Sequence, residues 1–193
     1  MSKVIYIALT IVALFLTFAQ AQTDNHSLKI SIPNYVGIKI VDSAGKIAVN
    51  ASVDFDFEAD FTSYAVAVAA GGADLSPTAV NGFSDIQVFT TQSAYWYVRT
   101  RAVVSSGFTG GINVGDISVD PGSVSGLSRG TGFSWVNPGW SLRTNWRTIA
   151  YGFFSTMGWS SIGFNGQDYK ISVQGNESVG THSLTVYYQL VTF

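Results

Sequence analysis

Short runs in which every second residue is apolar recur along this chain of 193 residues, and they constrain its fold more than any other feature. In residues 28–32 ("LKISI") and 36–40 ("VGIKI"), leucine, isoleucine or valine alternates with a polar residue or glycine. A period of two places apolar side chains on one face of a strand. Further candidate strands are residues 46–61, 64–70, 86–91, 94–104, 112–114, 117–119, 167–173 and 182–193. Many short strands separated by turns predict an all-β, antiparallel β-sandwich, with a small β-barrel as the alternative.

One of these runs, residues 53–61 ("VDFDFEADF"), alternates apolar residues with four acidic ones, namely Asp54, Asp56, Glu58 and Asp60. Such a row can be a metal or catalytic site, the solvent face of a strand, or the lumen of a membrane barrel. Calcium requires several oxygen atoms that converge on one point, whereas alternate side chains of a straight strand lie roughly 6.6 to 7 Å apart. We therefore expect the acidic residues to face solvent.

The same alternation predicts that the apolar residues of the run enter the core, namely Val53, Phe55, Phe57 and Phe61. Repulsion along an acidic row is reduced by a cationic neighbouring strand. Arg99 and Arg101 have the matching spacing in "YVRTR". We expect these two arginines to lie across from the acidic row.

The first 21 residues have the features of a secretory signal peptide. Lys3 precedes an apolar run over residues 4–18, and the small residues Ala19 and Ala21 lie at positions −3 and −1 of a cleavage site. The run is shorter than the roughly 20 residues that a membrane-spanning helix needs. We therefore predict cleavage after Ala21, a single domain over residues 22–193, and a secreted or cell-surface location.

The composition argues against several functions. Ten lysines and arginines against 12 acidic residues leave no basic excess, so nucleic acid is not an expected partner. The two histidines, His26 and His182, are each followed by a serine, but neither serine occurs in a Gly-x-Ser-x-Gly motif. We therefore expect no catalytic residues, metal or cofactor, and a protein that is not an enzyme.

The first and last strand patterns carry a resemblance to a known group of proteins. "SLKISIPNYVGIKIV" and "GTHSLTVYYQLVTF" resemble the terminal strands of secreted bacterial surface proteins of the fimbrial-subunit and spore-coat-U kind. The resemblance implies an immunoglobulin-like sandwich and a structural or adhesive role. It implies no site residues.

Aromatic residues are concentrated in residues 133–164, which hold four of the five tryptophans. Flat aromatic rings can stack on sugar rings, but they also dominate protein cores and subunit contacts. In "WVNPGW" the sequence Asn-Pro-Gly predicts a turn, so we expect at least one of the flanking tryptophans to be exposed. The candidate residues for ligand or subunit contact are Trp135, Trp140, Arg143 and Trp146.

These features together predict an exported, non-enzymatic structural or adhesive subunit of a cell surface. The expected partners are further copies of the chain or other envelope components, and polysaccharide is a third candidate. The alternatives are a carbohydrate-binding module and a small outer-membrane β-barrel. The segment with Leu28, Ile30 and Ile32 is a candidate for strand exchange between copies, the alternative being an ordinary first strand of its own domain.

Overall fold

The structure is a computed structural model that describes residues 29–31, 35–91, 94–108, 110–121, 133–136, 139–156 and 158–192. The chain divides into two units, Met1–Ile32 and Pro33–Phe193, which are described separately. The expected signal peptide, Leu28 and Ile32 lie outside the described residues. In the first unit, residues 29–31 have no regular secondary structure, and Ile30 is 72% exposed.

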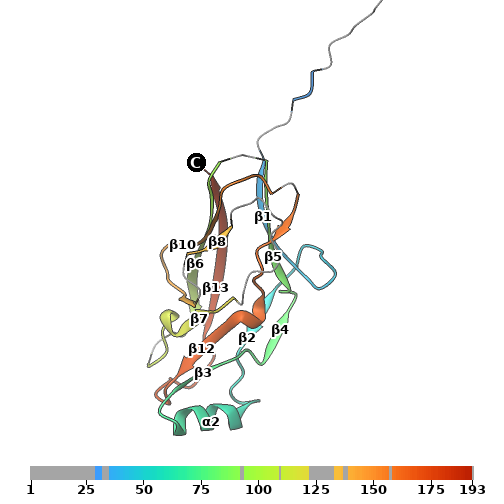
Figure 1. Ribbon diagram of the computed structural model, residues 1–193. Helices are drawn as coiled ribbons and strands as arrows, with labels where there is room; N and C mark the ends of the chain where they lie inside the picture. Colours follow the sequence, from blue (N-terminus) through green and yellow to red (C-terminus); the bar gives the residue numbers. More distant parts are fainter. Residues whose placement is uncertain are drawn as a thin grey trace, which may run out of the picture. The chain divides into compact units, whose positions relative to one another are not determined.

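The second unit consists mainly of antiparallel strands (Figure 1). The strands are β1 (Val36–Val41), β2 (Ser52–Asp54), β3 (Ala73–Leu75), β4 (Ala79–Asn81), β5 (Asp85–Thr90), β6 (Trp96–Ser106), β7 (Ile117–Val119), β8 (Ser134–Trp135), β9 (Trp140–Ser141), β10 (Arg147–Gly152), β11 (Ser160–Ser161), β12 (Tyr169–Val173) and β13 (Ser183–Thr192). The helix α2 (Phe61–Ala69) and the short 3-10 helices η1 (Val114–Asp116) and η2 (Gly166–Asp168) complete the described elements.

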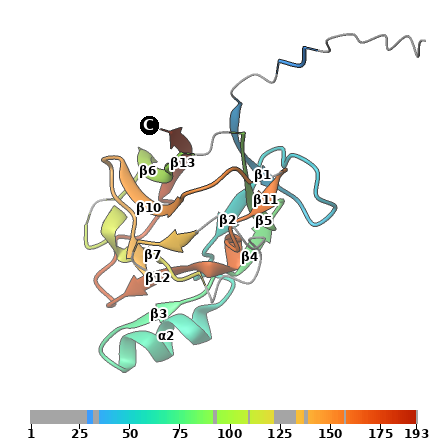
Figure 2. The same ribbon diagram turned by 45° about the horizontal axis from the view of Figure 1, so that its top comes forward.

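The strands form four sheets with the orders β1-β5-β11, β13-β6-β10-β8, β3-β12-β7-β9 and β2-β4. All of these strand pairs are antiparallel, which confirms the all-β, antiparallel class. The β6–β13 pair is the longest, and both ribbon views show β6 flanked by β13 and β10 (Figures 1 and 2). Within the described residues, no helix is long and apolar enough to cross a membrane.

Alternation along the strands determines which side chains enter the core. On β6, Trp96 and Val98 are fully buried, whereas Arg99 and Arg101 are on the opposite face and half-buried. On β5, Ile86 and Val88 are fully buried and belong to the same hydrophobic cluster as the β6 residues. The strands expected over residues 36–40, 86–91, 94–104, 117–119, 167–173 and 182–193 are present in β1, β5, β6, β7, β12 and β13.

The strands expected over residues 46–61 and 64–70 are wrong in extent and in type. β2 ends at Asp54, a turn follows, and residues 61–69 form α2. The Asp56 carboxylate accepts hydrogen bonds from the backbone N–H groups of Glu58 and Ala59, which stabilises the turn. Asp60 then caps the helix by accepting from the Ser63 N–H at 3.4 Å. Local side chain to backbone bonds therefore end the strand and start the helix.

The expected facing of residues 53–61 is partly confirmed. Val53, Phe55 and Phe57 pack against the core, and Asp54, Asp56 and Glu58 are exposed. Asp60 was expected to face solvent but is half-buried, because it caps α2. Phe61 is 66% exposed because it begins α2 instead of continuing a strand.

Two further expectations are corrected. Arg99 and Arg101 do not lie across from the acidic residues, because β6 pairs with β10 and β13 whereas β2 pairs with β4. Residues 112–114 do not form a strand: Ile112 is a buried loop residue, and η1 starts at Val114.

Candidate functional site

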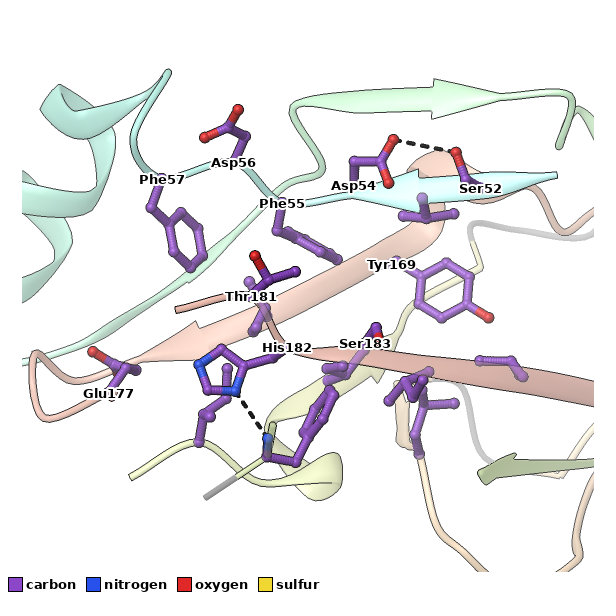
Figure 3. Close-up of a pocket in the computed structure, with 18 of the residues that line it drawn as sticks. Ser52, Asp54, Phe55, Asp56, Phe57, Tyr169, Glu177, Thr181, His182 and Ser183 are labelled. Atoms are coloured by element: carbon purple, nitrogen blue, oxygen red, sulfur yellow. Dashed lines mark hydrogen bonds between the residues drawn. The ribbon is translucent and has the colours of Figure 1, made fainter. Parts of the chain in front are cut away.

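An open groove with a volume of about 1170 Å³ lies beside the first half of β13 (Figure 3). One wall is formed by residues 51–58, together with Phe61 and Tyr64 of α2. The opposite wall is formed by residues 177–186, which lead into β13 and include its first residues. The floor is mostly apolar and comprises Ile40, Phe83, Phe108, Ile112, Ile117, Leu142, Tyr169, Ile171 and Tyr188.

The alternation that follows β2 gives the first wall an apolar inner surface. Phe55 and Phe57 point toward the opposite wall, and Asp56 points away from it (Figure 3). Phe57 stacks on Tyr64 of α2, with ring centroids 5.2 Å apart. Asp54 is held at the outer side by the Ser52 hydroxyl at 3.1 Å. The groove therefore has apolar walls and acidic groups along one rim.

The second wall contains His182, whose ring is held by two backbone groups. Its Nδ1 accepts a hydrogen bond from the Phe108 N–H at 2.8 Å, so the proton of the neutral ring is on Nε2, which donates to the Ser178 carbonyl at 2.9 Å. The neighbouring Ser183 hydroxyl bonds instead to the Ser106 hydroxyl at 2.8 Å. His182 and Ser183 thus make no base–nucleophile hydrogen bond, and the histidine fixes the shape of the wall.

Glu177 joins this wall to the helix on the other side. Its carboxylate accepts from the Tyr64 hydroxyl at 2.7 Å and from the Gln174 N–H at 2.5 Å. Burial raises the pKa of Glu177, but these hydrogen bonds outweigh burial and the pKa lies below its ordinary value. The hydrogen bond to Glu177 in turn raises the pKa of Tyr64. An ionised Glu177 therefore connects α2 to the segment between β12 and β13.

Two tyrosines lie at the floor of the groove. The hydroxyl groups of Tyr169 on β12 and Tyr188 on β13 are 2.5 Å apart. Burial raises the pKa of both phenols well above the ordinary value of 10.0, so both are neutral and one donates to the other. The pair satisfies two buried polar atoms at a place where two sheets meet.

The position of β13 determines what this groove can accept. β13 is the edge strand of the sheet β13-β6-β10-β8, because it pairs with β6 on one side and no further strand of the described residues follows it in the order. Leu184 and Val186 turn toward the groove, and Ser183 and Thr185 are exposed. A strand edge beside an apolar trough is suited to an extended peptide with alternating apolar side chains.

The four candidate contact residues named from the sequence are not in this groove. Trp140 is 2% exposed and stacks on the half-buried Trp135 at 5.2 Å between ring centroids. Trp140 also packs edge-on against Phe164 at 5.7 Å. The expectation of an exposed tryptophan at this turn is therefore wrong, because β8 and β9 turn both rings inward.

Arg143 and Trp146 have a different environment. Arg143 is exposed, and the half-buried Trp146 lies against the guanidinium of Arg101, with 4.9 Å from the ring centroid to Cζ. The structure therefore separates the four candidates into a core pair, Trp135 and Trp140, and a surface pair. Of the candidate exchange segment, only Ile30 is described, and it is exposed.

The sequence does not predict a groove, although some of the groove residues belong to the acidic run over residues 53–61. The groove forms because residues 51–58 and 177–186, which are distant in the sequence, face each other. Neither Glu177 nor Tyr64 lies in a motif that indicates a groove. The sequence indicates no role for His182, because the two backbone groups that hold its ring come from residues 108 and 178 and are identified only by the fold.

Within the part of the chain that the structure describes, no three His, Asp or Glu side chains are grouped so as to hold a metal ion. Comparisons with protein-family models, with curated proteins and with solved structures found no significant match.

Proposed function

We propose that this chain is an exported, non-enzymatic structural or adhesive subunit of a cell surface, with an immunoglobulin-like β-sandwich that assembles by strand addition. The observation that carries this proposal is the groove beside the edge strand β13. The sandwich is supported by the shared core, in which fully buried residues of β5 and β6 from two different sheets belong to one cluster.

The occupant of the groove is residues 28–32 of a second copy. In this segment Leu28, Ile30 and Ile32 alternate with Lys29 and Ser31, which is the pattern that an apolar trough next to a strand edge selects. Ile30 is 72% exposed, so its side chain is available to a partner.

Charge supports the same occupant. The alternation places Lys29 on the face opposite the isoleucines, toward the mouth of the groove. The rim carries Asp54, Asp56 and Glu58, which are all exposed. Attraction between a cation on the peptide and this acidic rim favours the insertion of the segment in one register.

Two substitutions on neighbouring residues test the proposal in the chain that lacks residues 1–21. Ile30→Asp places a charge on the apolar face of the segment, and we expect it to abolish oligomers seen by light scattering and negative-stain microscopy. Ser31→Lys adds a charge on the opposite face, toward the acidic rim, and should leave assembly intact. A monomeric parent chain at high concentration, or equal assembly by both variants, contradicts the proposal.

Removal of residues 22–32 distinguishes exchange from an ordinary first strand. If the segment serves a neighbour, the shortened chain folds, remains monomeric and gains thermal stability when a peptide of residues 22–32 is added. If the shortened chain does not fold, the segment belongs to its own domain and strand addition is wrong.

A further inference from the structure

The outer face of the sheet β13-β6-β10-β8 carries arginines between polar and aromatic side chains. Arg99 on β6 lies opposite Gln189 of β13 and Thr148 of β10. Two residues further along β6, Arg101 lies opposite Tyr187, which is 45% exposed. Alternate residues of a strand are roughly 6.6 to 7 Å apart, so the two guanidinium groups form a short row.

Aromatic rings hold the Arg101 side chain in place. Its Cζ lies 4.9 Å from the ring centroid of Trp146 and 5.4 Å from that of Tyr187. Cation–π contact of this kind orients a guanidinium without neutralising its charge. The Nε atoms of Arg99 and Arg101 are buried, and neither has a hydrogen-bond partner among the described residues.

A third arginine, Arg143, lies near one end of this face, and Arg147 of β10 is close to it but lies opposite the buried Thr100, on the core-facing side of the sheet. The backbone carbonyl of Arg143 accepts a hydrogen bond from Ala102 of β6 at 2.8 Å, which places Arg143 next to Arg101 along the strand. Burial, followed by repulsion from Arg143, lowers the pKa of Arg147. A neighbouring cation that perturbs Arg147 indicates a local excess of positive charge.

No acidic residue on these strands offsets that charge. Aspartate and glutamate are absent from residues 86–115, 121–167 and 178–193, which include all of β6, β8, β10 and β13. The arginines of this face therefore lack a carboxylate partner on the four described strands of their own sheet.

We propose that this face binds an acidic polysaccharide, and that Arg99 and Arg101 contact its carboxylate or sulfate groups. The planar guanidinium group donates two parallel hydrogen bonds to a carboxylate or sulfate through its terminal Nη groups. The exposed ring of Tyr187 and the ring of Trp146 provide flat apolar surfaces for the sugar rings between the anionic groups. An open sheet face suits a linear polymer, which needs no enclosed cavity.

A second copy of the chain fits this face less well. The acidic residues that follow β2 already accept hydrogen bonds from their own segment, Asp56 from two N–H groups and Asp60 from the helix N-terminus. They also lie on a turn and a helix cap, so they do not form a straight row that matches Arg99 and Arg101.

The test measures binding of the chain lacking residues 1–21 to polygalacturonate, dextran sulfate and unsubstituted dextran by isothermal titration calorimetry. We expect binding to one or both acidic polymers and none to dextran. Arg99→Gln/Arg101→Gln should weaken binding by about tenfold or more for each charge-assisted hydrogen bond that the substitutions remove. Binding should also weaken steeply with salt, because ~1 M salt shortens the screening length to ~3 Å.

Lys46→Gln is the matched control for charge. Lys46 is exposed in the turn after β1, away from this sheet, and its replacement should leave the affinity unchanged. Circular dichroism and thermal unfolding must show that all variants fold like the parent chain. If the double variant does not fold, Arg101→Lys takes its place. This substitution keeps the charge but removes the planar guanidinium, so it should also weaken binding.

Three results overturn the proposal. The first is equal binding of acidic and neutral dextrans by the parent chain, or no binding of either acidic polymer. The second is unchanged affinity in the folded arginine variants. The third is a parent chain that binds only vesicles containing phosphatidylglycerol, or that only self-associates through these arginines.

Discussion

Trp96 is fully buried, and its ring lies directly across the β6–β10 pair from Gly152. The indole Nε1–H donates to the Phe154 carbonyl at 2.9 Å, which fixes the ring position. A Cβ added at residue 152 would overlap the ring atoms of Trp96. The residue at position 152 must therefore be glycine for reasons of space, since its backbone φ is not positive.

We expect Gly152→Ala to lower the free energy of unfolding by at least ~1 to 3 kcal/mol, which is the usual cost of overpacking a core. Urea unfolding followed by tryptophan fluorescence measures the change. Gly115→Ala is the matched control, because a Cβ there meets nothing within 4 Å and the φ of Gly115 is not positive. An equal decrease in both variants would contradict the steric explanation.

At the scale of single elements, α2 depends on its first residues. Asp60 caps the helix, and Ala67 and Val68 turn toward the core side. Asp60→Ala should lower the free energy of unfolding by about 0.5 to 2 kcal/mol, the usual cost of removing such a cap. Asp60→Asn keeps an acceptor oxygen and should be close to the parent chain in urea unfolding. If both variants have the same free energy of unfolding as the parent chain, Asp60 does not stabilise α2.

The same helix marks the limit of what the sequence predicted about the elements. β5, β6 and β13 were predicted well because each has one buried face, and burial of one face produces a period of two. In "YAVAVA" (residues 64–69) small alanines alternate with valines, and this pattern fits a strand as well as a half-buried helix. The hydrogen bonds of Asp56 and Asp60 favour the helix over the strand. These bonds depend on backbone geometry, which cannot be inferred from the alternation of apolar residues.

At the scale of the whole molecule, the groove follows from which strands pair and which do not. β13 pairs along its length with β6, and among the described strands β2 pairs only with β4. These pairings join segments that are far apart in the chain, so alternation within each segment could not reveal the groove or its walls. The arginine face had a partial signal, because "YVRTR" identified Arg99 and Arg101 as neighbours on one face. The sequence assigned them the wrong opposing strand.

The tyrosine pair at the floor of the groove links stability of the whole unit to pH. Burial raises the pKa of Tyr169 and Tyr188 above the ordinary value of 10.0, so both phenols stay protonated in the folded chain after those of the unfolded chain ionise. Their contribution to the free energy of unfolding is therefore complete below about pH 10 and declines above it, by up to about 1.4 kcal/mol per pH unit for each phenol.

The double variant Tyr169→Phe/Tyr188→Phe removes both hydroxyls together, which leaves no unpaired polar atom and should cost little at neutral pH. Urea unfolding between about pH 8 and about pH 11 should show a shallower decline for the double variant than for the parent chain. Parallel declines would mean that the two phenols ionise as readily in the folded chain as in the unfolded one, and that the pair does not keep the β12–β13 junction dry.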